Sequence, residues 1–447
     1  MRYIPHTECE VERMLEAIGV ESLDELFSTV PAKHRLDRPL DLARAATEQE
    51  LLQELGRLAE RNASTESHDW FLGGGVYAHF VPSAVDALIS RAEFYSAYTP
   101  YQAEISQGTL QAIFEWQTMI SGLTGLEVAN ASMYDGASAT AEAALMAMRS
   151  TRRSRVVVAE GLHPHYREVL DTYLDGLEAE VVTAPRGEDG RTAPPGALVD
   201  DATACVIVQQ PSFLGTVEDL KSLAADASAH GAQLVVAVAE ALSLALLTAP
   251  GACGADIVCG EAQSFGVPMS LGGPHLGFMA TRQKLVRQLP GRLVGQTVDS
   301  EERRGFVLTL STREQHIRRD RATSNICTNQ GLCLMMATIY LSLMGPVGLR
   351  KLAELNLAKA EYAKRRVAET PGLALTLPAP TFNEFVVNVP DSAAAALARA
   401  REVGCMGGID LEPFAPELGP ALLVCTTERS PRAAIDELVG VLAEAAP

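Results

Sequence analysis

Short apolar runs alternate with longer amphipathic stretches along the middle of the chain. Runs of this kind, bounded by polar residues, are typical of buried strands, whereas apolar residues at every third or fourth position are typical of helices. Their alternation predicts a mainly parallel sheet covered by helices on both faces. The predicted strands are 155–159, 180–184, 204–209, 233–239, 257–259 and 276–280, with helices at 165–176 and 219–230 among them.

The first seventy residues carry repeated start signals for helices. A Ser or Thr followed three residues later by Glu matches a capping box, and apolar residues at helical spacing follow each pair. We therefore expect an amino-terminal helical arm that packs on a partner or on the main domain. The pairs are Thr7 with Glu10, Ser22 with Glu25, and Thr47 with Glu50.

The carboxy-terminal part has a different pattern from the middle of the chain. A long helical region is expected at 329–369. Nearer the amino end, two other helices are expected, one at 82–96 and one that begins at Ser106. Two strands and two further helices then predict a compact α+β domain. These are the strands 382–389 and 421–425 and the helices 392–403 and 431–445.

The predicted elements divide the 447 residues into three parts, as expected for a chain too long for one small core. Residues 1–70 form the helical arm and residues 71–328 the large α/β domain. Residues 329–447 supply the linking helices and the small α+β domain.

Composition narrows the class of partner and the compartment. A net charge of −19 argues against a nucleic-acid or anionic-membrane surface. The uncharged stretch 332–349 is interrupted by Gly345 and Pro346, so a buried core helix is expected and not a membrane span. The charged start of the chain does not match a signal peptide. Eight scattered cysteines without a CxxC pair indicate reduced thiols in the cytoplasm, with neither a disulfide framework nor a metal site.

A glycine-rich loop at 260–278 follows a predicted buried strand. Open α/β sheets usually keep their chemistry at the carboxyl ends of such strands. The glycines let the backbone approach a ligand, yet only Gln263 and Ser264 offer polar side chains at the centre. The alternative is a tight structural crossover without a ligand. The three glycines 73–75 similarly indicate either a flexible hinge or a backbone that lies very close to another group.

A second unusual loop, 97–108, is dense in hydroxyl and amide side chains. So many directional polar groups are costly to bury unless they bind something, although an ordinary polar connector has the same composition. The residues of interest are Tyr98, Thr99, Tyr101 and Gln102.

A large α/β domain followed by a small α+β domain is the plan of many pyridoxal-phosphate enzymes. These enzymes need an anion-binding helix start, an aromatic or histidine ring, a carboxylate for the pyridine nitrogen and a lysine for the Schiff base. The helix start could be supplied by the segment from Ser132, the ring by His163 and the carboxylate by Glu240.

The lysine is missing from this series. The chain has six lysines, and none of them follows a strand into a glycine-rich loop. Lys284 lies on a basic helical face and is expected to be solvated. A self-sufficient enzyme that uses Lys284 therefore remains only a third hypothesis, and the chain by itself is not expected to form the Schiff base.

Five segments together resemble the glycine decarboxylase (P-protein) family of the glycine cleavage system. The resemblance covers essentially the whole chain, including Ile4-Pro5-His6-Thr7. In particular, the chain resembles the amino-terminal half of that protein, which in some bacteria is a separate subunit. The segments are 71–76, 99–108, 129–136, 263–277 and 305–312.

The resemblance implies a fold of the pyridoxal-phosphate transferase type (fold type I) and a partner of the same fold. In this family the cofactor lysine belongs to the other half, before a similar Gly-Gly-Pro turn, and the matching position here is Gln263. The family typically has Asp where this chain has Glu240. Pyridoxal phosphate is therefore expected on the partner, and this chain is expected to keep a degenerate site made of Ser132, His163, Glu240 and Gln263.

The implied reaction is the first step of glycine breakdown. Glycine loses its carboxylate with pyridoxal phosphate as the electron acceptor, and the aminomethyl group passes to the lipoyl arm of H-protein. Tyr98, Thr99, Tyr101 and Gln102 are the side chains expected to reach the partner's site across the interface. The competing hypothesis is a structural or regulatory pseudoenzyme that lends no side chain to the chemistry.

Overall fold

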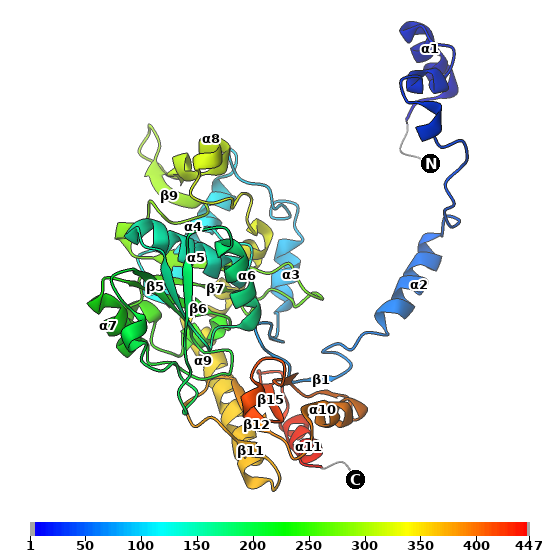
Figure 1. Ribbon diagram of the computed structural model, residues 1–447. Coiled ribbons are helices and arrows are strands. Elements are labelled where there is room, and N and C mark those ends of the chain that lie inside the picture. Colours follow the sequence, from blue (N-terminus) through cyan, green and yellow to red (C-terminus); the bar gives the residue numbers. More distant parts are fainter. Residues whose placement is uncertain (1–4, 445–447) are drawn as a thin grey trace. The chain divides into compact units, whose positions relative to one another are not determined.

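Seven strands form the central sheet of the large domain, in the order β2-β8-β7-β6-β5-β3-β4 (Figure 1). The computed structural model describes residues 5–444. The strands β3 to β7 pair in parallel, and β8 runs antiparallel to β7 and β2. The predicted strands are confirmed to within two residues. The bounds are β2 Val128–Ala129, β3 Arg155–Ala159, β4 Glu180–Ala184, β5 Thr203–Gln209, β6 Gln233–Val238, β7 Ile257–Glu261 and β8 Gly277–Thr281.

Both faces of this sheet are buried, because successive side chains of each strand point to opposite faces. Val157 and Val206 pack in one core with helices α4, α7 and α9, whereas Val156 and Cys205 pack in the other with α5 and α6. The predicted two-sided α/β arrangement is confirmed. The helices are α4 Gln107–Thr124, α5 Gly136–Thr151, α6 Pro164–Leu174, α7 Leu220–Ala229 and α9 Gly331–Glu369.

The long helix α9 connects the large and the small domain. It is apolar and long enough to count as a candidate membrane span by composition alone. However, Gly345 has non-helical angles (φ 58°, ψ 175°) and breaks the helix directly before Pro346. The apolar half before this break is shorter than the ~20 residues that a span needs, and its Leu334 and Tyr340 are buried in the core. The prediction of a core helix is confirmed.

The small domain packs an antiparallel sheet, in the order β11-β12-β15-β14, against α10, α11 and the second half of α9. A short parallel pair, β1 with β13, joins residues just before Phe71 to the same domain, and Phe71 lies in its core. The predicted α+β unit is therefore observed. The bounds are β1 Asp69–Trp70, β11 Ala374–Leu375, β12 Glu384–Asn388, α10 Ala393–Glu402, β13 Cys405–Met406, β14 Ile409–Asp410, β15 Ala421–Cys425 and α11 Arg432–Leu442.

The amino-terminal residues up to Ala63 form a unit of their own. The helices α1 (Glu8–Ile18) and α2 (Glu48–Ala59) start at the predicted capping boxes of Thr7 and Thr47, which are confirmed. The box at Ser22 is wrong, because its side chain makes no capping bond and only a 3₁₀ turn follows (η1, Leu23–Phe27). None of the described residues of this unit is buried, so its packing surface stays a prediction.

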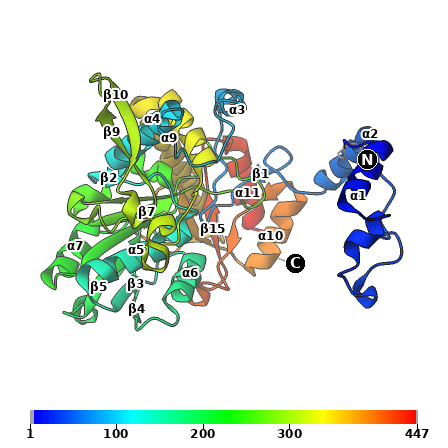
Figure 2. The same ribbon diagram turned by 90° about the horizontal axis from the view of Figure 1, so that it is seen from above.

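Two further expectations differ from the structure. The helix predicted at 82–96 is only α3 (Ser83–Ile89), and Ser106 precedes α4 without a side-chain capping bond. An antiparallel hairpin of β9 (Leu293–Val298) and β10 (Arg304–Thr309), which packs beside α4, was not predicted (Figure 2). Its strands are mostly exposed or half-buried, and their apolar residues do not alternate regularly with polar ones, so the sequence gives no clear strand pattern.

Candidate functional site

Three of the predicted cofactor-site residues follow strands of the parallel part of the sheet. His163 comes after β3, Glu240 after β6 and Gln263 after β7. The carboxyl ends of parallel strands meet at the same edge of a sheet. The structure brings all three residues into contact with residues 71–81, called here the inner segment.

Gln263 is bonded to the backbone on every side. Its Oε1 accepts from the Tyr77 N–H at 3.0 Å, and its Nε2 donates to the carbonyls of Tyr77 (3.2 Å) and Val267 (2.7 Å). The side chain is 3% exposed. The amide therefore fixes the inner segment against the end of β7, and both of its N–H groups are used in doing so.

Glu240 forms a buried ion pair with a histidine of the inner segment. His79 Nε2 lies 3.0 Å from Glu240 Oε2, and His79 Nδ1 lies 2.8 Å from Glu428 Oε2. Burial opposes a charged imidazole, but the two carboxylates outweigh it and raise the pKa of His79 to about 10. The ring is therefore an imidazolium that donates to both carboxylates.

The pKa of Glu428 is shifted in the opposite direction, downward. Burial favours its neutral form, but the hydrogen bond and charge of His79 prevail and lower the pKa of Glu428 to about 2. Glu428 also accepts from the Phe80 N–H at 2.6 Å, so the inner segment is fixed here by a side chain and by its backbone.

A third buried carboxyl holds the first half of the inner segment. The Tyr77 hydroxyl donates to Glu384 Oε2 at 2.8 Å, and the Gly74 N–H donates to Glu384 Oε1 at 2.6 Å. Burial raises the pKa of Glu384 to about 7, against these two donors.

The three glycines of the inner segment are explained by close approach and not by a hinge. A Cβ at Gly73 would lie 2.2 Å from Glu384 Oε1, and one at Gly75 would lie 3.2 Å from His163 Nε2. Gly75 also has a φ of +103°, which other residues rarely adopt. Side chains at these positions would push the segment out of its place.

The His163 ring is covered by neighbouring aromatic rings. It stacks on Tyr166 with centroids 4.9 Å apart and meets Phe213 edge-on at 5.0 Å. Its Nε2 donates to the Gly74 carbonyl at 2.7 Å, and burial lowers the pKa of His163. Its Nδ1 accepts from the His165 N–H, as expected for the neutral ring.

The predicted anion position at the start of α5 is filled by a carboxyl group of the chain itself. Glu261 accepts from the N–H groups of Gly136 (3.1 Å), Gln263 (3.1 Å) and Leu276 (2.7 Å). Glu261 is 3% exposed, and burial raises its pKa to about 7 against these donors. Gly136 is the first residue of α5, whose N–H groups are natural anion ligands.

Ser132 is not part of this network. It is fully buried, and its hydroxyl accepts from the Gln330 N–H at 3.2 Å, just before α9. The structure therefore brings together His163, Glu240 and Gln263 of the four predicted residues, and places Ser132 elsewhere.

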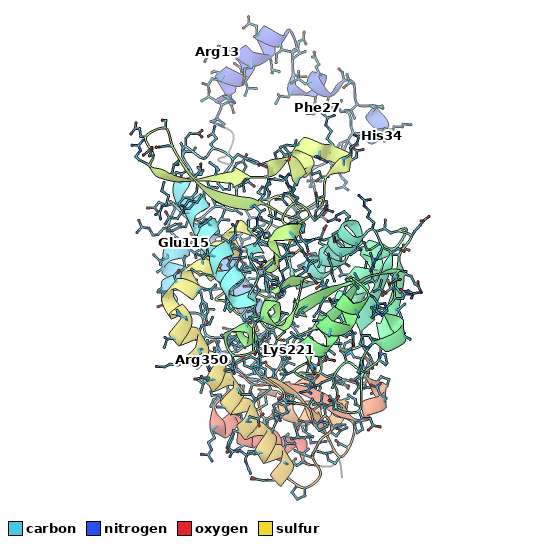
Figure 3. All side chains as sticks on the ribbon, turned by 90° about the vertical axis from the view of Figure 1, so that its left-hand side faces the viewer. Arg13, Phe27, His34, Glu115, Lys221 and Arg350 are labelled. Carbon is cyan, nitrogen blue, oxygen red and sulfur yellow. The ribbon has the colours of Figure 1, made fainter. Side chains whose placement is uncertain are left out.

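These residues do not fit pyridoxal phosphate on this chain. The Glu240 carboxylate, which would meet its ring, is bonded to His79, and the first N–H of α5, which would meet its phosphate, is bonded to Glu261. No lysine within residues 5–444 takes the place of Gln263. Lys284 is exposed and pairs with Asp256, and Lys359 donates to carbonyls on the loop before α11. Lys221 lies on α7 (Figure 3).

The predicted polar loop, residues 97–108, forms one wall of a separate cavity of about 160 Å³. Thr99 lies in this wall and is 5% exposed, whereas Tyr98 (77%) and Tyr101 (46%) reach the surface. Gln102 is also exposed. Three of the four predicted side chains are thus available for an interface, and the fourth faces the cavity.

A buried arginine ties this loop to the large domain. Arg292 Nε lies 3.1 Å from Glu314 Oε2, and Nη2 donates to the Tyr101 hydroxyl at 3.0 Å. Nη1 donates to the Cys327 carbonyl. Both charged side chains are almost completely buried, so the pair is a fixed support for Tyr101 and the wall of the cavity.

Comparison with known proteins decides the family. The sequence model of the protein family described as "Glycine cleavage system P-protein" matches residues 1–442. The chain belongs to the glycine cleavage system P-protein family.

Named relatives agree over the full length. A protein of Anaeromyxobacter dehalogenans described as a probable glycine dehydrogenase (decarboxylating) subunit 1 is 55% identical over 96% of both chains. One of Thermomicrobium roseum with the same description is 51% identical over 100% of both chains. A crystal structure of glycine decarboxylase (P-protein) in inhibitor-bound form superposes with a TM-score of 0.91, at 46% identity over 99% of both chains.

More distant structures support the fold alone. A Burkholderia pseudomallei sphingosine-1-phosphate lyase superposes with a TM-score of 0.66 at 16% identity, covering 92% of this chain and 93% of its own. A Lactobacillus brevis glutamate decarboxylase gives 0.67 at 14%, covering 93% and 96%. Together with the P-protein structure, they confirm the expected pyridoxal-phosphate fold type I.

Several residues of this P-protein family member were not singled out from its sequence. His79, Glu261, Glu428 and the pair of Arg292 with Glu314 all become important only through contacts with distant segments. The available signal was weak: a charged or ionisable residue inside an apolar stretch, as at His79 between Ala78 and Phe80.

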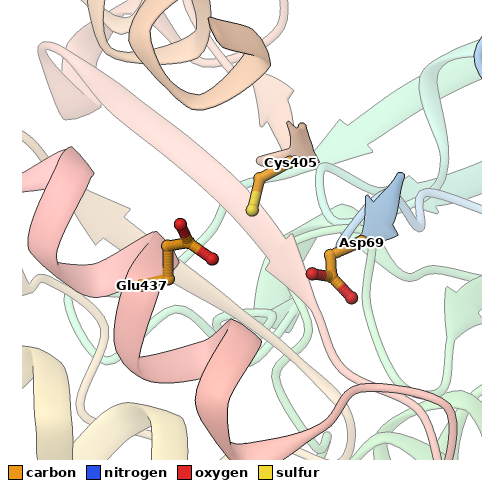
Figure 4. A group of neighbouring side chains, drawn as sticks. All are labelled: Asp69, Cys405 and Glu437. Atoms are coloured by element: carbon orange, nitrogen blue, oxygen red, sulfur yellow. The ribbon is translucent and has the colours of Figure 1, made fainter. Parts of the chain in front are cut away.

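A further group of possible metal ligands lies in the small domain. Asp69, Cys405 and Glu437 point toward one another, with ligand atoms within 4.8 Å (Figure 4). Burial and the two carboxylates raise the pKa of the Cys405 thiol to about 11. Since metals bind the thiolate, this protonated thiol is a poor ligand at neutral pH, and we do not assign a metal site here.

Proposed function

We propose that this chain is the glycine decarboxylase subunit without the cofactor lysine. With a lysine-bearing partner, it removes the carboxylate of glycine with pyridoxal phosphate and passes the aminomethyl group to the lipoyl arm of H-protein. The relatives support this proposal, because they share its full length and are described as subunit 1 of that enzyme, a description that implies a second subunit. We also propose a cytoplasmic location, in keeping with eight free cysteines.

The observation that carries the proposal is the state of Gln263. A residue with no amine occupies the end of β7, and its amide is fully bonded to the backbone of Tyr77 and Val267. Without an amine at this position the chain has no group for the Schiff base, so the cofactor belongs on the partner in this proposal.

This chain contributes the polar loop to the partner's site in the proposal. Tyr98 and Tyr101, whose rings meet edge-on at 6.1 Å, and Gln102 are exposed and can contact groups across an interface. Thr99 lines the cavity behind them. The Tyr101 hydroxyl accepts from Arg292 and keeps its own O–H to donate. Arg292 donates to the Tyr101 hydroxyl and so orders the loop before the partner binds. This lowers the entropic cost of positioning the loop side chains at the partner's site.

The proposal is tested by co-expression of this chain with the lysine-bearing partner. Exchange of carbon between glycine and bicarbonate is measured with lipoylated H-protein, for each chain alone and for the mixture. Activity in the mixture only is the expected result. Full activity of the partner alone would contradict a catalytic contribution and would assign this chain to the structural or regulatory class.

Substitutions in the polar loop test the role of its side chains. Tyr101→Phe removes the acceptor of a charge-assisted hydrogen bond from Arg292 and is expected to lower turnover of the assembled enzyme about tenfold or more. Thr99→Ala is expected to lower it as well, because it changes the cavity wall.

The matched control for the loop is Tyr173→Phe on α6, the same chemical change outside the loop. Turnover is measured with saturating partner, and assembly is measured by gel filtration. Unchanged turnover in both loop variants, with assembly intact, would remove the support for a catalytic contribution.

A further inference from the structure

We propose that this subunit keeps its own cofactor position permanently closed with internal groups, the Glu261 carboxyl in place of a phosphate and the His79 imidazolium in place of a pyridinium. The inference rests on the proposed function in one respect: if the partner carries the cofactor, a closed position in this chain leaves one working site in each pair of subunits. It concerns only side chains of this chain.

The place of a pyridinium is filled by the imidazole of His79. A pyridinium cofactor needs a carboxylate at the end of a strand that accepts its ring N–H. Glu240 at the end of β6 has this position, and it accepts at 3.0 Å from the ring nitrogen of His79. His79 is a flat, protonated aromatic ring with an N–H directed at that carboxylate, so it satisfies Glu240 in the way that a cofactor ring would.

The place of a phosphate is filled by the Glu261 carboxyl. A phosphate needs several backbone N–H groups at a helix start, and the first residue of α5 supplies one of them. Glu261 accepts from that N–H and from two more, of Gln263 and Leu276. A Cβ at Gly136 would lie 2.1 Å from the Tyr166 hydroxyl and 3.1 Å from the Glu261 Cβ, so Tyr166 and Glu261 pack directly against this helix start.

Tyr77 of the inner segment is held next to His79, with ring centroids 6.2 Å apart. Tyr77 is 1% exposed, and its backbone is bonded to Gln263 while its hydroxyl is bonded to Glu384. A cofactor ring would therefore have to displace the inner segment and break the His79 ion pairs. The closure is independent of the missing lysine, and restoring a lysine alone is not expected to restore the site.

Gln263→Lys tests this independence. The full chain carrying this substitution is treated with millimolar pyridoxal phosphate and then with borohydride, and the modified peptides are quantified by mass spectrometry. We expect at least about tenfold less modification at position 263 than at position 283 in Gln283→Lys, the same change at an exposed glutamine. Visible absorbance of a bound Schiff base is expected to be absent from the Gln263→Lys protein.

Modification at position 263 equal to or above that at position 283, with the visible band, would overturn the proposal. This readout needs no partner and no decarboxylase activity. The exchange assay could therefore contradict the proposed function while the modification experiment still supports a closed site. Conversely, modification at position 263 could overturn the closed site while the exchange assay supports the proposed function.

Hydrogen exchange of the unmodified chain gives a second measurement that needs no variant. The Tyr77 N–H is buried and bonded to Gln263, and the Leu276 N–H is buried and bonded to Glu261. Both are expected to exchange slowly, and pyridoxal phosphate is expected to leave their rates unchanged within a factor of about two. Fast exchange, or a change of more than tenfold in protection on addition of pyridoxal phosphate, would overturn the proposal.

Discussion

Replacement of His79 by alanine is expected to lower the free energy of unfolding by about 3–5 kcal/mol. The substitution leaves Glu240 and Glu428 buried without the cation that both contact, and it also opens a cavity beside Tyr77. Unfolding in urea measures the change. His230→Ala, on a histidine whose side chain is 44% exposed, is the matched control and is expected to change the stability by less than about 1 kcal/mol.

The stabilisation by His79 is expected to depend on pH in a defined window. Its folded pKa of about 10 lies above the ordinary histidine value of 6.5, so the contribution is complete below pH 6.5 and is lost as the pH rises toward 10. The folded pKa of Glu428 is lowered from 4.5 to about 2, so its contribution is complete above pH 4.5 and is lost as the pH falls toward 2.

The difference in stability between wild type and His79→Ala should therefore be largest between pH 4.5 and 6.5 and should shrink toward pH 10. Glu240 and Glu428 are the carboxyls in contact with this ring, Glu384 interacts with Glu240, and Lys359 donates to the Glu428 carbonyl. A difference that stays constant across this range would contradict a charged His79.

Arg292→Met is expected to reduce turnover of the assembled enzyme about 100-fold, because the polar loop loses its support and Tyr101 shifts. The change also leaves the buried Glu314 with only the half-exposed His316, at 3.5 Å, as a possible partner, so the free energy of unfolding is expected to fall by about 3 kcal/mol. Turnover at saturating glycine and urea unfolding measure the two effects separately.

Two further variants separate positioning from general destabilisation. Arg350→Met removes an exposed arginine of α9 with a single ion pair (Figure 3) and is expected to leave turnover unchanged. In the double variant Arg292→Met with Tyr101→Phe, the losses should be less than additive, because both single changes break the same contact. Additive losses would show that the two residues act independently.

Much of the large domain could be predicted from its sequence. The strands at 155–159 and 180–184 are correct to the residue, because each is a short apolar run between polar boundaries. The hairpin at 293–309 was missed and the helix at 82–96 was predicted too long, because neither segment has a clear apolar period. Resemblance, and not periodicity, supplied the position of Gln263.

The amino-acid sequence alone was enough to predict the fold class, the family and the absence of a suitable lysine. These features depend on local apolar patterning and on the identity of residues, both of which can be read in one dimension. The contacts of the inner segment with the degenerate site could be seen only in the folded structure. Its contacts join residues separated by 161 positions for His79 with Glu240 and by 349 for His79 with Glu428. Hydrogen bonds and ion pairs of this kind depend on geometry that folding alone creates, and no local pattern in the sequence encodes them.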